Sequence, residues 1–147
     1  MRLALGADHA GWRLKDHLRD QLVARGHEVL DKGTHSDESC DYPELAAAVG
    51  RSVAGGEAEM GILVCGTGIG MAMAANRIPG VRAANCTDLF SVRLAREHNA
   101  ANVLALGARV IAAQHAEALA EAFLATPFAG GRHQRRIDQI AALDRRG

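Results

Sequence analysis

A cysteine followed at once by alternating glycines is the feature of this sequence best suited to chemistry. The apolar run Gly61-Ile62-Leu63-Val64 ends in Cys65, and the loop Gly66-Thr67-Gly68-Ile69-Gly70 leads into the helix-like segment 71–76. A strand–loop–helix junction of this kind directs several backbone N–H groups to one point, beside a positive helix end. That point favours an anion and the thiolate form of a nearby cysteine. The sequence therefore predicts a small anionic substrate or intermediate next to a nucleophile or base.

The same loop departs from the two common nucleotide-binding patterns. It lacks the Gly-Lys-Ser/Thr ending of a P-loop, and Met71 stands where the dinucleotide pattern needs its third glycine. Asp88 does lie at a suitable distance downstream for an acid that binds ribose, but the loop follows a middle strand rather than the first one. A nucleotide-binding module without turnover therefore remains only an alternative.

The pair Asp8-His9 follows the first predicted strand. The carboxylate can bind sugar hydroxyls and the imidazole an anion, or Asp8 can simply cap the next helix. In open α/β sheets, ligands bind outside the carboxyl ends of the strands. We therefore expect Asp8, His9, Cys65, Gly66 and Thr67 to share one rim.

Further polar candidates lie later in the chain. His98 ends a predicted helix, where it is either a charge partner for the helix dipole or a general acid/base. Arg132 and Arg136 are four residues apart in the last predicted helix, so they share a face that can bind a phosphate, although a solvated charged turn is the alternative. Arg109, after the fifth predicted strand, is a weaker candidate of the same kind.

Short apolar runs alternate with longer amphipathic stretches along the chain. Asp41 is a suitable N-cap for the second helix, and Pro43 suits its first turn. Repeated βα units predict a doubly wound parallel sheet in one domain that spans residues 1–147. Strands are predicted over residues 3–5, 28–31, 60–65, 81–84 and 102–106, and helices over 11–24, 42–54, 71–76, 88–97, 112–125 and 133–145.

The bulk properties limit the class of partner. The chain has 147 residues, 48% apolar and 23% charged, with zero formal net charge, so the overall charge favours neither nucleic acid nor a membrane surface. No apolar stretch approaches the ~20 residues of a membrane span. Cys40, Cys65 and Cys86 form no C-x-x-C pair, which fits a reducing cytoplasm, and we expect Cys40 and Cys86 to be structural. No grouping of His, Cys, Asp and Glu has the spacing of metal ligands.

Taken together, these segments resemble the ribose-5-phosphate isomerase B family, within the wider group that includes galactose-6-phosphate isomerase subunits. The resemblance implies a Rossmann-like three-layer α/β sandwich with a five-stranded parallel sheet and a C-terminal helix. It also implies a homodimer or a dimer of dimers whose active sites lie at the interface and draw on both subunits. The resemblance runs nearly end to end and rests on residues 6–11, 31–34, 41–43, 61–70, 98–99, 102–109 and 130–134.

The resemblance implies the interconversion of an aldose phosphate and a ketose phosphate without metal or organic cofactor. Ribose 5-phosphate is the expected sugar, and allose 6-phosphate, galactose 6-phosphate or a tetrose phosphate is the alternative. Some members have a glutamate base where this chain has Gly70, so the chain resembles the branch that uses a cysteine. The resemblance implies that Cys65 is the base and that Thr67, with His98, assists opening of the furanose ring. Sugar oxygens would contact Asp8 and Asn99, and Tyr42 would line the pocket. The phosphate would be bound by His9, Arg109, Arg132 and Arg136, and the enediolate by backbone donors of Gly66, Gly68, Ile69 and Gly70.

Overall fold

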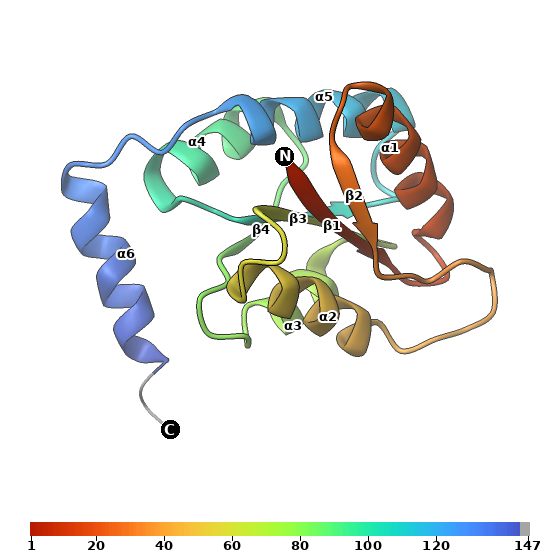
Figure 1. Cartoon of the computed structure of the whole chain (residues 1–147), viewed down its shortest axis with the longest axis horizontal. Coiled ribbons are helices and arrows are strands. Elements are labelled where there is room, and N and C mark those ends of the chain that lie inside the picture. The colour runs from red at the N-terminus through yellow and green to blue at the C-terminus, as the bar shows by residue number, and fades with distance from the viewer. Residues whose placement is uncertain (145–147) are drawn as a thin grey trace.

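One parallel sheet carries helices on both of its faces (Figure 1). The computed structural model describes residues 1–144. All paired strands are parallel, in the order β2-β1-β3-β5-β4. The elements in chain order are β1 (Arg2–Ala7), α1 (Trp12–Ala24), β2 (Glu28–Asp31), α2 (Tyr42–Ala54), β3 (Met60–Cys65), α3 (Ile69–Ala75), β4 (Ala83–Asn85), α4 (Leu89–Asn99), β5 (Val103–Gly107), α5 (Ala113–Ala125) and α6 (Arg132–Leu143).

The central strands are apolar throughout because both faces of the sheet are covered. In β3, Ile62 and Val64 belong to the core that α1, α4 and α5 complete, whereas Leu63 and Cys65 belong to the core on the side of α2 and α3. A parallel strand buried on both faces reads as a continuous apolar run, which is the pattern seen in the sequence. The predicted three-layer α/β sandwich is confirmed.

The second helix lies where the local pattern predicts it. α2 begins at Tyr42 and ends at Ala54, and Pro43 lies in its first turn, as predicted. Asp41 occupies the predicted N-cap position, but its side chain makes no cap hydrogen bond. An N-cap carboxylate normally accepts from the second or third helical N–H. Pro43 occupies the second position and has no N–H to give, which leaves only the N–H of Glu44 at the third position as a donor for such a cap.

The last helix, α6, stands apart from the layers. It begins at Arg132, one residue earlier than predicted, and its predicted end at residue 145 lies outside the described residues. His133 and Ile137 are its buried residues. In Figure 1 α6 extends from the side of the molecule, beside α4. No helix within residues 1–144 has the length and apolar character needed to cross a membrane.

Candidate active site

Three strands end side by side at the carboxyl rim of the sheet. Ala7, the last residue of β1, pairs with Val64, and Cys65 pairs with Gly107 at the end of β5. The N–H of Asp8 donates to the carbonyl of Val64 at 3.2 Å, which continues the pairing one residue further. The register thus brings Asp8 and Cys65 to one rim, as the strand pattern predicts.

Cys65 and the glycine loop form the centre of this rim. The Sγ of Cys65 accepts a hydrogen bond from the N–H of Gly68 at 3.1 Å. The sulfur therefore faces the loop and acts there as a hydrogen-bond acceptor. Gly68 has a φ of +84°, a conformation that glycine adopts without steric cost. Cys65 is only 6% exposed, because much of its side chain packs in the core beside α2 and α3.

Asn85 holds the loop in place, a role that our sequence analysis missed. Its Nδ2 donates to the carbonyl of Thr67 at 3.2 Å and to the carbonyl of Ala105 at 3.0 Å. Gly107 permits the same close approach, since a Cβ there would lie 2.7 Å from the carbonyl oxygen of Thr67. The available signal was a polar residue that follows the apolar pair 83–84, as Asp8 follows β1.

Asp8 is buried and holds the turn into α1. Its Oδ1 accepts the N–H of Ala10 at 2.9 Å and that of Gly11 at 3.1 Å. The alternative that Asp8 caps the next helix is not realised, because Gly11 is the N-cap of α1 and the helix has no side-chain cap hydrogen bond; Asp8 instead holds the turn before it. This turn also fixes the backbone of His9 at the rim.

The orientation of His9 depends on a residue from a distant loop. The N–H of Cys40 donates to the Nδ1 of His9 at 3.2 Å. A neutral imidazole that accepts at Nδ1 carries its proton on Nε2, so Nε2–H is the donor available to a ligand. Sequence analysis assigned Cys40 a structural role, and nothing in the local pattern connected its main chain with His9.

Two more predicted residues join the rim. A Cβ on Gly70 would lie 2.6 Å from the Cζ of Tyr42, so the phenol ring lies directly against the loop. The N–H of Arg109 donates to the carbonyl of Gly66 at 3.0 Å, and the Arg109 side chain lies beside that glycine. We call the residues gathered here the rim set: Asp8, His9, Tyr42, Cys65, Gly66, Thr67, Gly68, Ile69, Gly70 and Arg109.

The remaining candidates form a second group, the junction set, which consists of His98, Asn99, Arg132 and Arg136. His98 and Asn99 end α4, and the two arginines lie in the first turns of α6. The rings of His98 and His133 are stacked, with centroids 4.2 Å apart and planes inclined by 13°. His133 is a residue to which sequence analysis gave no role.

The two sets lie at opposite ends of the sheet. α4 ends just before Val103, the first residue of β5, whereas Cys65 pairs with Gly107, the last residue of that strand. At about 3.3 Å per residue, the length of β5 alone separates these levels by about 13 Å. One chain therefore does not bring the junction set to Cys65.

Asp88, the acid considered for ribose binding in a nucleotide site, caps a helix instead. Asp88 is the N-cap of α4, where its Oδ1 accepts the N–H of Ser91 at 2.7 Å and its Oδ2 accepts the Ser91 hydroxyl at 3.0 Å. These hydrogen bonds lower the pKa of Asp88. Capping accounts for this residue without a ribose.

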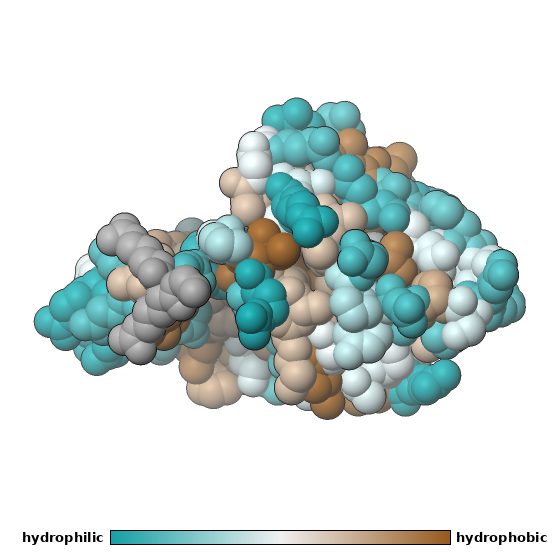
Figure 2. Space-filling view, turned by 90° about the horizontal axis from the view of Figure 1, so that it is seen from below, coloured by the Kyte–Doolittle hydropathy of each residue, from teal (hydrophilic) through white to brown (hydrophobic). Residues whose placement is uncertain are grey.

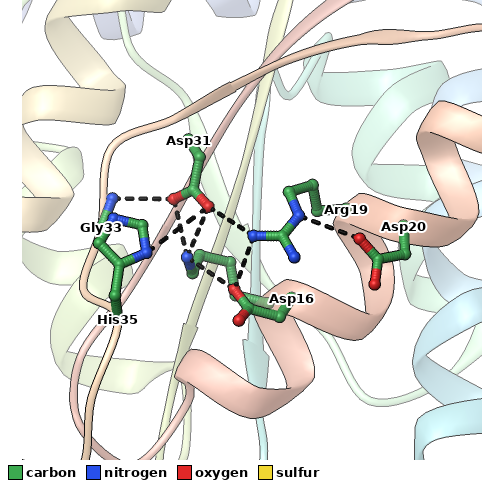
Figure 3. Close-up of polar contacts among 7 residues, drawn as sticks. Asp16, Arg19, Asp20, Asp31, Gly33 and His35 are labelled. Atoms are coloured by element: carbon green, nitrogen blue, oxygen red, sulfur yellow. Dashed lines mark hydrogen bonds and ion pairs between the residues drawn. The ribbon is translucent and has the colours of Figure 1, made fainter.

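A group of potential metal ligands lies beside α1 and already holds a cation. Ligand atoms of Asp16, Asp31 and His35 lie within 4.8 Å of one another. The Nζ of the fully buried Lys15 lies 2.9 Å from Asp16 and 2.7 Å from Asp31 (Figure 3). Burial raises the pKa of Asp31, but the hydrogen bonds it accepts outweigh burial and leave its pKa below the ordinary value. The Lys15 ammonium group therefore balances the negative charge of these two carboxylates, as a bound metal ion would.

Comparisons with known proteins identify relatives of this chain. The family described as Ribose/Galactose Isomerase matches residues 3–140. Ribose-5-phosphate isomerase B of Escherichia coli is 47% identical over 145 residues, which cover 99% of this chain and 97% of that protein. The structure of ribose-5-phosphate isomerase B from Clostridium thermocellum superposes with a TM-score of 0.97 at 45% identity and covers 98% of this chain and 97% of that one. The Mycoplasma genitalium enzyme with bound ribulose-5-phosphate has a TM-score of 0.95 at 37% identity, over 99% of this chain and 97% of that one.

Proposed function

Since the chain belongs to the ribose/galactose isomerase family, we propose that it interconverts D-ribose 5-phosphate and D-ribulose 5-phosphate through an enediolate. The observation that carries this proposal is the Sγ of Cys65, which lies at the carboxyl rim and accepts the N–H of Gly68 at 3.1 Å. A sulfur base beside loop amides suits a reaction that moves a proton between adjacent carbons while negative charge grows on oxygen. The proposed reaction uses neither a metal nor an organic cofactor.

In the proposed chemical step, the Cys65 thiolate removes the proton from C2 of the open-chain aldose. The electron pair of the broken C–H bond forms the C1–C2 double bond, and the oxygen on C1 becomes negative. Backbone N–H groups of the loop 66–70 stabilise that oxygen, which is the largest single contribution in reactions of this type. The proton of the C2 hydroxyl passes to the oxygen on C1, which leaves the negative charge on the C2 oxygen. The Cys65 thiol then returns its proton to C1 as the carbonyl forms at C2.

The phosphate binds away from the reacting carbons. His9 offers its Nε2–H because Cys40 holds its Nδ1, and Arg109 lies beside Gly66 at the same rim. Arg132 and Arg136 add two guanidinium groups suited to a phosphate. Binding energy from this remote group positions the sugar over Cys65.

Two copies of the chain complete one site in this proposal. The rim set of one copy carries the base, and the junction set of the other carries His98, Asn99, Arg132 and Arg136. This arrangement is supported by the separation of the two sets, which places their members at opposite ends of β5. We therefore propose a homodimer or a dimer of dimers with the active sites at the interface.

Apolar surface beside each set supports this pairing. Ile69, a member of the rim set, is 50% exposed, and Met73, one turn later in α3, is 68% exposed. Beside the junction set, a groove of about 390 Å³ runs between α6 and the body and includes Val81, Ile137 and Ile140 in its walls. In Figure 2, α6 projects from the rest of the molecule on the left, and hydrophobic residues are visible where the helix meets the body. Exposed apolar surface of this kind is typical of an interface.

The proposal is tested by an assay of the purified protein with ribose 5-phosphate in the presence of EDTA. We expect ribulose 5-phosphate to form at a rate that the chelator leaves unchanged, and inhibition by EDTA would contradict the metal-free mechanism. A comparison of kcat/KM for ribose 5-phosphate, allose 6-phosphate, galactose 6-phosphate and erythrose 4-phosphate identifies the preferred sugar.

The three cysteines of the chain are unpaired, which supports a cytoplasmic setting for the protein.

A further inference from the structure

The stacked pair of His98 and His133 is built into the backbone where α6 meets α4. The N–H of Ala129 donates to the carbonyl of Glu97 at 3.0 Å, one residue before His98. Arg96 Nε donates to the carbonyl of Thr126 at 3.1 Å. These two contacts tie the segment that leads into α6 to the last turn of α4. The facing imidazoles, 4.2 Å apart and nearly parallel, are therefore set by the fold.

The two members of the pair differ in their surroundings. His133 is 9% exposed, whereas His98 is half-buried. Burial, followed by the nearby His98, Arg132 and Arg136, lowers the pKa of His133. Two imidazolium rings in face-to-face contact repel one another, so the buried ring is the one that stays neutral. His98, the more exposed ring, is the one that a ligand can reach.

We propose that His133 is a positioning residue for His98, which it holds flat and in one orientation for the opening of the furanose ring. This inference rests on the function proposed above. In ring opening, the anomeric hydroxyl loses a proton, the bond between C1 and the ring oxygen breaks, and the ring oxygen gains a proton. A general acid/base must lie within hydrogen-bond reach of such a proton, so the orientation of its ring matters.

Ring opening can be separated experimentally from enolisation. Ribulose 5-phosphate has its 5-hydroxyl blocked and forms no furanose, so exchange of its C1 protons with D2O needs only the step at Cys65. The experiment measures kcat for ribose 5-phosphate and the C1 exchange rate by NMR, in the wild type and in His133→Ala and His133→Phe variants. For His133→Ala we expect kcat to fall by about tenfold or more while the exchange rate falls less than about twofold. His133→Phe keeps a flat ring in contact with His98 and should retain most of the wild-type kcat.

Two control variants separate this role from general destabilisation. Ile137→Ala removes the next buried side chain on the same face of α6 but keeps both imidazoles, and His17→Ala removes an exposed histidine on α1. Both should leave the ratio of kcat to exchange rate at its wild-type value. Equal loss of both rates in His133→Ala, no loss of either, or a His133→Phe variant as slow as His133→Ala would overturn the proposal. If the wild type shows neither isomerisation nor exchange, the proposed function itself is refuted, and the role of His133 with it.

Discussion

At the scale of single residues, the chemistry depends on which atoms the rim leaves available. The Sγ of Cys65 has one backbone donor, Gly68, and the Nδ1 of His9 is engaged by the N–H of Cys40. Each of these contacts comes from main chain, so neither depends on the rotamer of another side chain. The rim therefore presents a sulfur atom and an imidazole N–H donor in defined orientations.

Replacement of Cys65 by alanine should abolish turnover and leave phosphate binding largely intact. Removal of a general base costs about 100-fold or more in kcat. Steady-state kinetics measures that loss, and competition by inorganic phosphate measures the phosphate site. Cys86→Ala is the matched control, because Cys86 is also buried, and burial followed by Asp88 raises the pKa of its thiol. A Cys65→Ala enzyme with near-normal kcat would refute the assignment of the base.

At the scale of elements, α1 and β2 are joined by ionic contacts that lie outside the site. Lys15 projects from α1 to Asp31 at the end of β2, and Arg19, one turn later, reaches the same carboxylate at 3.1 Å (Figure 3). Asp31 also accepts the N–H of Gly33 at 2.9 Å. This cluster fixes the start of the loop that carries Cys40 toward His9.

Asp31→Asn should destabilise the protein in a pH-dependent way. Loss of one charge from a largely buried pair costs about 2–4 kcal/mol in the free energy of unfolding near pH 7. The folded state depresses the pKa of Asp31, so its contribution is complete above the unfolded value of about 3.9 and is lost as the pH falls through the folded value. Urea titrations at fixed protein concentration should therefore show the two proteins converging as the pH falls below about 4.

The exposed Asp20 provides the control for that experiment. It also pairs with Arg19, but its side chain is 74% exposed, so Asp20→Asn should cost less than about 1 kcal/mol. If the two variants are equally stable, or if the effect of Asp31→Asn grows toward acid pH, the role given to the buried pair is wrong.

At the scale of the whole molecule, the sheet separates the parts of the proposed site. The rim set lies at the carboxyl ends of β1, β3 and β5, and the junction set lies where α4 returns to the amino end of β5. A two-fold symmetric pair presents the same surfaces twice. Each copy can therefore supply one rim set and one junction set, and a pair of copies forms two equivalent sites.

Mixed dimers test this arrangement directly. Arg136→Ala alone should raise KM by about tenfold, through the loss of one charge-assisted hydrogen bond to phosphate, and the Arg135→Ala change on the same helix should not. When Cys65→Ala and Arg136→Ala chains are co-expressed, half of the randomly formed dimers are mixed. Each mixed dimer has one site with both residues intact, so about a quarter of the wild-type sites should be recovered. If activity at low substrate only averages that of the two variants, the site is not shared between copies.

Local patterns predicted most of the elements and the centre of the site. The continuous apolar run in β3 and the helix over 42–54 depend on neighbours in the chain, and their bounds agree with the prediction. Asp41 takes the predicted N-cap position, but the residue type did not reveal that its side chain makes no cap hydrogen bond. Asn85, Cys40 and His133 were missed because each acts on a partner that only the packing of distant segments brings near.

The sequence by itself determined the α/β class, the cysteine–glycine junction and the rim that Asp8 shares with Cys65, since periodicity and the direction of parallel strands suffice for these. Only the tertiary structure decided the strand order, the support of His9 by Cys40 across 31 residues of chain, and the separation of His98 from Cys65. Hydrophobic periodicity reports which side of an element is buried. It carries no information on which element covers that side, and the contacts made there are the ones that place the functional groups.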